Sequence, residues 1–259
     1  MRVGVAGVGI VGPGLAGWEA TAAALRGAAP YVAAPIIEPS SVPAQLRRRT
    51  SLGTRIAIGA ALEAVSRSGR SASDLAAVFA SAAGSGTEVS HLLEALAQPD
   101  LPVSPTHFHN SVHNSAVGYW CMTTASHRPS TSVACHDDTF AAALLKAAAQ
   151  VAEERQATIL AVFDAPFPQP LHSSRPIGAA LAIALVLVPP GSSSVPEMEI
   201  DLRWSGEVPT TRLPPEFTRL AQSNPAGRGL PLLLALARRE STAALPYLEN
   251  GRIGITLWH

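Results

Sequence analysis

The chain has 259 residues, of which 47% are hydrophobic and 15% are charged, enough to bury one large core or two modest ones. Its 19 basic and 19 acidic side chains balance, so no overall field draws it to nucleic acid or to a membrane surface, and we expect neither as a partner. Two cysteines make no disulfide framework, we expect no secretory signal, and the longest apolar stretch, residues 177–190, is too short to span a bilayer; we therefore expect a cytoplasmic protein.

Strand-like and helix-like patterns alternate along the chain. Continuous apolar runs predict buried strands, and apolar residues every three or four positions predict helices. The expected strands cover residues 3–11, 75–81, 130–134, 157–163, 177–188, 198–204 and 252–257. The expected helices cover residues 18–26, 51–68, 87–97, 115–125, 138–155 and 230–239, and residues 30–50 and 99–110 are expected to be loops. This alternation predicts an α/β fold with a mainly parallel sheet between layers of helices.

The first chemical pattern is glycine-rich. Residues 7–12, Gly-Val-Gly-Ile-Val-Gly, spell the G-x-G-x-x-G of dinucleotide-binding turns. However, Pro13-Gly14 interrupts the place where the phosphate-binding helix should run, and Glu38 lies beyond the position of a ribose-binding carboxylate, in a proline-rich loop. We therefore expect a glycine-rich turn and no cofactor.

The second pattern consists of three histidines, His107, His109 and His113. Imidazole nitrogens at such spacings can ligate zinc. No carboxylate or cysteine lies within the cluster to complete a tetrahedral set, and the segment is expected to be a loop. We therefore expect hydrogen-bonded loop histidines and no metal.

Cys135 is the third candidate, because it stands between a strand pattern and an Ala/Leu-rich helix pattern. A thiol at the start of a helix lies near unpaired backbone N–H groups, which favour a thiolate and can stabilise an oxyanion. Asp137 and Asp138 oppose this because carboxylates repel a developing thiolate. The adjacent His136 is not expected to face the thiol. From the residues alone, Cys135 is either a reactive nucleophile or a small residue at a buried turn.

Four segments occur in a characteristic order. They are residues 3–14 (VGVAGVGIVGPG), 48–65 (RRTSLGTRIAIGAALEAV), 104–149 and 157–168 (ATILAVFDAPFP). Their order resembles the N-terminal half of β-ketoacyl-carrier-protein synthases, which have the thiolase-like fold. More narrowly, it resembles the short chain-length-factor-type homologues of aryl polyene clusters. The most specific stretch is residues 108–142, with the sequence His-Asn-Ser-Val-His-Asn at 109–114 and Gly-Tyr-Trp at 118–120.

The resemblance covers residues 1–190, which we expect to form the ketosynthase-like N-terminal domain. Residues 191–259 are expected to be a reduced C-terminal region packed on the same core. The resemblance implies that Cys135 holds the position of the family's acyl-accepting cysteine. It also implies that the strand before Cys135 pairs with its two-fold mate across a subunit interface. The expected interface residues are Ser130, Thr131, Ser132, Val133, Ala134 and Trp120.

A working ketosynthase of this family also needs two groups, usually histidines, from its C-terminal half to stabilise the developing enolate. Beyond the cysteine turn the chain offers His172 and His259, and neither matches a family motif. We therefore expect a catalytically incomplete chain that is inactive alone.

The expected function is that of a chain-length-factor-like partner subunit of a β-ketoacyl-[acyl-carrier-protein] synthase in fatty-acid or polyketide biosynthesis of the aryl polyene type. The subunit would shape the acyl tunnel at its interface with a full-length ketosynthase, as a heterodimer, or with itself, as a homodimer. The complex would have 3-oxoacyl-carrier-protein synthase activity, and acyl carrier protein is a further expected partner. The alternative is a stand-alone acyltransferase or thioesterase in which His113 or His109 activates Cys135.

Overall fold

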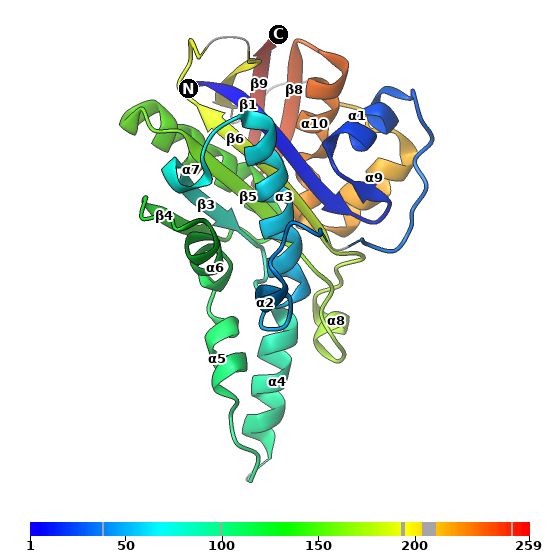
Figure 1. The fold of residues 1–259 in the computed structure, drawn as a ribbon. Coiled ribbons are helices and arrows are strands. Elements are labelled where there is room, and N and C mark those ends of the chain that lie inside the picture. The colour runs from blue at the N-terminus through cyan, green and yellow to red at the C-terminus, as the bar shows by residue number, and fades with distance from the viewer. Residues whose placement is uncertain (38, 99, 193–194, 204–210, 250) are drawn as a thin grey trace.

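The computed structural model describes residues 1–259 apart from 38, 99, 193–194, 204–210 and 250. Glu38, Pro99 and Trp204, which the expectations above include, lie outside the described residues. The described strands form one nine-stranded sheet in the order β4-β3-β5-β6-β1-β7-β9-β8, with the short β2 paired to β1 (Figure 1). The strands are β1 (Arg2–Gly12), β2 (Leu15–Ala16), β3 (Ala76–Ala80), β4 (Ser130–Val133), β5 (Thr158–Asp164), β6 (Leu181–Val188), β7 (Glu197–Arg203), β8 (Thr242–Tyr247) and β9 (Gly251–Trp258).

Helices lie on both faces of this sheet and beyond one of its ends (Figure 1). They are α1 (Trp18–Arg26), α2 (Ala44–Arg47), α3 (Leu52–Ser68), α4 (Gly86–Ala97), α5 (Pro105–Ser111), α6 (Ser115–Thr124), α7 (Thr139–Glu154), α8 (Leu171–Ser174), α9 (Pro215–Ser223) and α10 (Leu230–Arg238). Three 3-10 turns, η1 (Ala72–Asp74), η2 (His136–Asp138) and η3 (Pro225–Gly229), complete the described elements. No described helix has the length and apolar character needed to cross a membrane.

The sheet is mixed, and most of its pairings are antiparallel. Among the described strands, the parallel pairings are those of β3 with β4 and of β3 with β5. Both β5 and β1 run antiparallel to β6, and β7, β9 and β8 continue as an antiparallel ladder. The expected mainly parallel sheet is therefore wrong. Strands that alternate with helices along the chain do not fix the direction in which each strand enters the sheet.

The central strands are buried on both faces, because alternate side chains enter two different cores. Val78 and Leu160 point into a core shared with α7 and α10. Phe79 and Ile159 point the other way, into a core shared with α3 and α6. The sequence-based α/β assignment, with helices on both faces, is confirmed by this arrangement.

Glycines in β1 allow α3 to lie directly against the sheet. A β-carbon on Gly7 would lie 2.0 Å from the carbonyl oxygen of Ala64, and one on Gly9 would lie 2.0 Å from that of Ala60. The G-x-G spacing therefore serves helix-to-strand packing. The expectation of a glycine-rich turn is wrong for these two residues, which lie inside a strand; Gly12 alone adjoins the turn into β2.

Helices α4 and α5 form an arm, residues 86–111, that projects beyond the sheet (Figure 1). The expected loop over 99–110 is wrong from Pro105 onward. Ser104 caps α5, its Oγ accepting a hydrogen bond from the N–H of His107 at 3.4 Å, and Pro105 occupies the first helical turn. A capping serine followed by proline is a recognised start of a helix.

Residues beyond 190 continue the same sheet. β7 pairs with β1, and β9 and β8 follow it outward. α10 packs its leucines into the core shared with α7. A boundary at residue 190 would fall between β6 and β7, the two strands that flank β1 in the sheet. The division into residues 1–190 and 191–259 stays a prediction from the sequence.

Candidate functional site

Cys135 lies half-buried between the end of β4 and the start of α7. The turn η2 separates it from α7, and Asp138 occupies the N-cap position of that helix. His136 adopts a φ of 47°, in the left-handed region, and its side chain is exposed. The thiol therefore lies at a turn between a strand and a helix, as the sequence predicts, with Cys135 at the N-cap of η2 and η2 between it and α7.

Hydrogen bonds close the turn around Cys135. Its backbone N–H donates to Oγ1 of Thr139 at 2.9 Å, and the Thr139 hydroxyl donates to the carbonyl of His136 at 2.7 Å. The carbonyl of Cys135 accepts the N–H of Asp138 at 2.9 Å. Since the Cys135 N–H is engaged within the turn, it is not available to stabilise an oxyanion at the thiol.

The two carboxylates after Cys135 are paired with arginines. Arg175 lies 2.5 Å from Asp137, and Arg228 lies 3.3 Å from Asp137 and 2.8 Å from Asp138. Burial works against ionisation of Asp137, but the hydrogen bond and charge of Arg175, with the charges of Arg228 and His136, hold the pKa of Asp137 below its ordinary value. The two negative charges that the sequence places beside the thiol are therefore paired with arginine charges.

A buried polar cluster lies at the ends of β3 and β5. Asp164 is fully buried, and its Oδ1 accepts hydrogen bonds from the Ser81 hydroxyl at 2.8 Å and the Ala82 N–H at 2.9 Å. Asn224 donates to the backbone carbonyl of Asp164 at 3.1 Å. Burial raises the pKa of Asp164 to about 7. The sequence analysis did not identify this cluster; its one signal was a carboxylate at the end of an apolar strand.

The histidines of the 107–113 segment diverge. His107 contacts Glu88, His109 stacks edge-on against Tyr119 with ring centroids 5.6 Å apart, and Nε2 of His113 lies 3.1 Å from the carbonyl of Ser81. In the described part of the chain, no hydrogen bond joins any of them to Cys135.

Asn110, in the same segment, is buried and ties three elements together. Its amide donates to the Arg49 carbonyl at 2.6 Å, and its oxygen accepts the Tyr119 hydroxyl at 3.0 Å. Burial raises the pKa of Tyr119. The motif that carried the family resemblance therefore fixes the base of the arm to α6.

The outer edge of β4 has no partner strand among the described residues. β4 pairs with β3 on one side, with Val78 opposite Thr131, and forms the end of the sheet. Ser130 and Ala134 are exposed and the residues between them are half-buried. Trp120 is fully buried and packs on Phe79 with ring centroids 5.8 Å apart. The expectation that Trp120 contributes to an interface surface is therefore wrong for its side chain.

Exposed apolar side chains occur along the arm, and α6, which packs next to β4, adds Met122. The exposed apolar residues of residues 86–124 are Leu93, Leu96, Leu101, Val103, Phe108, Val112 and Met122. Figure 1 shows α6 beside β4, with α5 and α4 extending beyond it, away from the sheet. A concentration of this kind indicates a surface that another molecule covers.

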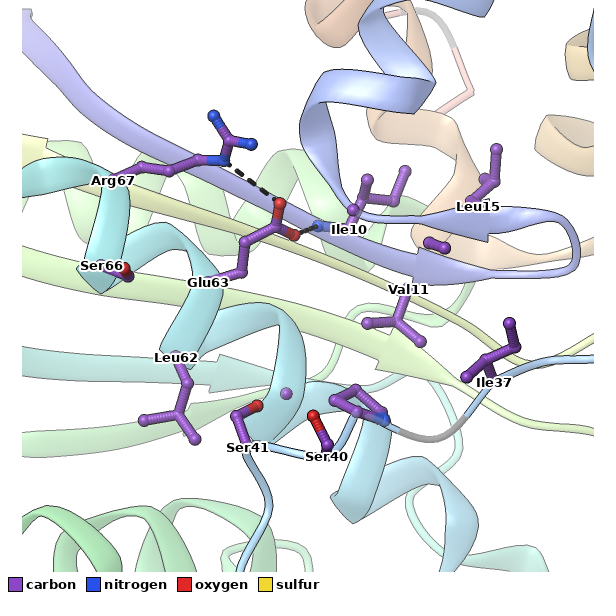
Figure 2. A pocket seen from close by; sticks show the side chains of 14 residues that line it. Ile10, Val11, Leu15, Ile37, Ser40, Ser41, Leu62, Glu63, Ser66 and Arg67 are labelled. Atoms are coloured by element: carbon purple, nitrogen blue, oxygen red, sulfur yellow. Dashed lines mark hydrogen bonds and ion pairs between the residues drawn. The ribbon is translucent and has the colours of Figure 1, made fainter.

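A cavity of about 590 Å³ lies between β1, the β2 turn and α3, and Cys135 does not line it. Figure 2 shows Glu63 reaching from α3 to β1, where its carboxylate accepts the N–H of Ile10 at 3.0 Å and a contact from Arg67 at 3.2 Å. Near the cysteine turn, Asp137 and Arg228 line a cavity of about 150 Å³. That volume holds about five waters and no long acyl chain.

Comparison with known families places the chain in one of them. The family described as "Beta-ketoacyl synthase, N-terminal domain" matches residues 17–246. The chain therefore belongs to this family, and its mixed sheet between helices is the thiolase-like fold of ketosynthases.

Solved structures show the same fold over nearly the whole chain. One is the ketosynthase ApeO in complex with its chain length factor ApeC from Xenorhabdus doucetiae, with a TM-score of 0.75 and 21% identity over 99% of both chains. A type II polyketide ketosynthase complex with its acyl-carrier protein, AntDE:AntF, has a TM-score of 0.75 and 11% identity over 99% of this chain and 98% of that one. The ishigamide ketosynthase/chain length factor has a TM-score of 0.71 and 14% identity over 99% and 98%. Among curated protein sequences, no match was found.

Proposed function

We propose that this chain is a chain-length-factor-like, catalytically incomplete partner subunit of a β-ketoacyl-[acyl-carrier-protein] synthase. It would bind a full-length ketosynthase as a heterodimer and shape the acyl tunnel at their interface, in biosynthesis of the aryl polyene type. The partner would carry out the condensation on substrates delivered by acyl carrier protein. The likeness to chains from ketosynthase/chain length factor complexes supports this general kind of role.

The observation that carries the proposal is the open edge of β4, next to α6 with its exposed Met122 and at the base of the arm that carries further exposed apolar side chains. An uncovered strand edge next to apolar surface is a ready template for strand pairing with a second chain. We propose that Ser130–Val133 pairs antiparallel with the equivalent strand of the partner. An obligate interface of this kind would bury on the order of 2,000 Å² or more.

The turn around Cys135 supports a non-catalytic role. Its N–H is donated to Thr139, and a carboxylate takes the helix N-cap. His172 lies on α8, whereas His259 hydrogen bonds to the Glu240 carbonyl at 3.1 Å, at the opposite end of the molecule from the arm (Figure 1). No observation favours the stand-alone acyltransferase, for which a histidine must reach Cys135.

The register of β4 shows which of its backbone groups point away from β3, toward the open edge. Ala77 N–H donates to the carbonyl of Pro129, and Ser81 N–H donates to that of Val133. In a parallel pair, the peptide groups of alternate residues point to the same side. Thr131, midway between the two acceptors, therefore faces β3, and the peptide groups of Ser130 and Ser132 face the open edge.

This register provides the test. Ser132→Pro removes the one N–H that the open edge presents at the middle of the strand, and proline is tolerated at a strand edge that points to solvent. We expect the variant to keep its thermal unfolding midpoint within a few degrees and to lose association with the ketosynthase encoded in the same host. Co-purification followed by light scattering on the eluted complex measures this.

Two further variants act as controls. Ser132→Ala keeps the backbone donor and should associate normally. Thr131→Pro breaks a hydrogen bond to β3 and should lower the unfolding midpoint itself. If the wild type associates with itself and does not bind the ketosynthase, the assembly is a homodimer and the proposed heterodimer is wrong. A monodisperse monomer at micromolar concentration that binds no ketosynthase would overturn the proposal.

A further inference from the structure

A second cluster of titratable groups lies in the arm, apart from Cys135. Glu88 and His91 are three residues apart on α4, so both side chains lie on the same face of that helix. His107 faces them from α5. Nδ1 of His107 lies 2.5 Å from Oε2 of Glu88 and 3.3 Å from Nδ1 of His91, and the two imidazole rings are 4.4 Å apart. The three ligand atoms lie within 4.8 Å of one another.

When both imidazoles are neutral, a single proton on Nδ1 of His107 must serve both Glu88 and His91. A neutral imidazole nitrogen either donates one hydrogen bond or accepts one. If Nδ1 of His107 donates its proton to Glu88, it has no lone pair left to accept a bond from His91. If Nδ1 of His91 also carries a proton, two N–H groups point at each other. A cation among the three atoms would satisfy two nitrogen lone pairs and one carboxylate oxygen at once.

The separation of the two imidazole nitrogens suits a small tetrahedral ion. With metal–ligand bonds of about 2.0–2.1 Å, two ligands of a tetrahedron lie about 3.3–3.4 Å apart. The separation between the two Nδ1 atoms, 3.3 Å, has this value. The distance from Glu88 to His107 would have to open by roughly 0.8 Å to reach it, a change within the reach of rotation about the end of the glutamate side chain.

We propose that Glu88, His91 and His107 bind one divalent cation of the zinc class. Two imidazoles and one carboxylate form a ligand set that prefers zinc to magnesium or calcium, which favour oxygen ligands. Glu88 is buried whereas His91 is exposed, so the fourth position opens toward solvent on the side of His91. The cation would cross-link α4 and α5 and so restrict their relative motion in the arm, which carries the exposed Leu96 and Phe108.

The backbone already holds His107 in place for this role. Its N–H donates to the capping Ser104, which fixes the first turn of α5. The site needs no contribution from Cys135 or from β4, so it stands independently of the proposed partner function.

Titration of the full chain with Zn²⁺, without a histidine tag and after removal of bound metal with a chelator, tests the proposal. Competition with a chromophoric chelator should show one equivalent bound with micromolar or tighter affinity. Co²⁺ in place of Zn²⁺ should give the intense visible absorption of a tetrahedral site. His91→Ala and His107→Gln should each weaken binding at least about tenfold.

His127→Ala is the matched control, because His127 is exposed and lies outside the cluster; this variant should bind as the wild type does. His91 is also exposed, so its replacement should leave the fold intact, which circular dichroism checks. Equal binding by the His91, His107 and His127 variants, or no binding of Zn²⁺ below about 100 µM, would overturn the proposal.

Discussion

Asp164 couples the stability of the chain to pH through a single side chain. One of its oxygens accepts two hydrogen bonds, whereas Oδ2 is buried and has no protein partner among the described residues. Burial therefore raises the pKa of Asp164 from 3.8 to about 7. Because the folded pKa is the higher one, the folded chain holds a proton that the unfolded chain loses above pH 4. This group's contribution to stability falls as the pH rises from about 4 to 7 and is constant above that.

Asp164→Asn removes this dependence while keeping the size of the side chain. Relative to the variant, we expect the wild type to lose about 2–3 kcal/mol of unfolding free energy between pH 5 and pH 8. Urea unfolding of both proteins at the two pH values measures the difference. Asp74→Asn, which replaces an exposed carboxylate, is the control. The difference in unfolding free energy between this variant and the wild type should change by close to zero between the two pH values. If the wild type and the Asp164→Asn variant differ in stability by the same amount at both pH values, the assignment is contradicted.

For single residues, the sequence predicted where a residue lies in the fold better than it predicted which residues it contacts. Cys135 lies at a strand-to-helix turn, as expected. The partners of the acidic pair were not predictable, because Arg175 and Arg228 come from segments that only the folded chain brings to the turn. The divergence of His107, His109 and His113 was hidden for the same reason: in the folded chain, the three side chains point to different neighbours.

The contact between β1 and α3 depends on glycine. Gly9→Ala would place a methyl group 2.0 Å from the Ala60 carbonyl, so the helix or the strand must move. We expect a loss of about 3 kcal/mol or more in unfolding free energy, at the upper end of overpacking effects. Gly118→Ala, on the exposed face of α6 with no atom within 4 Å of the new methyl, should instead be neutral or stabilising by up to about 1 kcal/mol. Urea denaturation compares the two variants, and equal stability of Gly9→Ala and Gly118→Ala would contradict this packing.

Most elements could be predicted from the sequence, because long apolar runs and regular helical spacing are local signals. The structure places β1, α3, β5 and α7 within one or two residues of the expected bounds. α5 was missed although Ser104 and Pro105 give a helix start, because the prolines around it suggested a loop. Strand direction was predicted wrongly, because β6 and β7 flank β1 through pairings between distant parts of the chain.

The molecule as a whole has an unequal distribution of exposed apolar surface. Large exposed side chains lie along the arm, whereas the opposite end, near both termini, carries Trp258 under the guanidinium of Arg2, 4.6 Å from the ring centroid (Figure 1). The arm and the β4 edge together define the side on which we expect the partner.

Phe108→Ala tests this placement. Phe108 is 62% exposed, so its loss should leave the unfolding free energy within about 0.5 kcal/mol. At the centre of an apolar interface, a large aromatic typically contributes more than 1 kcal/mol, so affinity for the ketosynthase should fall about tenfold or more. Trp258→Ala, an exposed aromatic at the far end, should not change it. Surface plasmon resonance compares the three proteins, and equal affinities would place the interface elsewhere.

The central position of β1 has a consequence for how the chain is made. β1 is made before every other described strand, yet its main partners are Leu181–Val188 and the start of β7. At 5–20 residues per second, the strand waits roughly ten to thirty seconds for them. Through that interval a nascent chain carries an apolar segment whose main partner strands have not yet been made. We therefore expect the supply of this protein in the cell to depend on chaperones that hold β1 until β6 and β7 have been made.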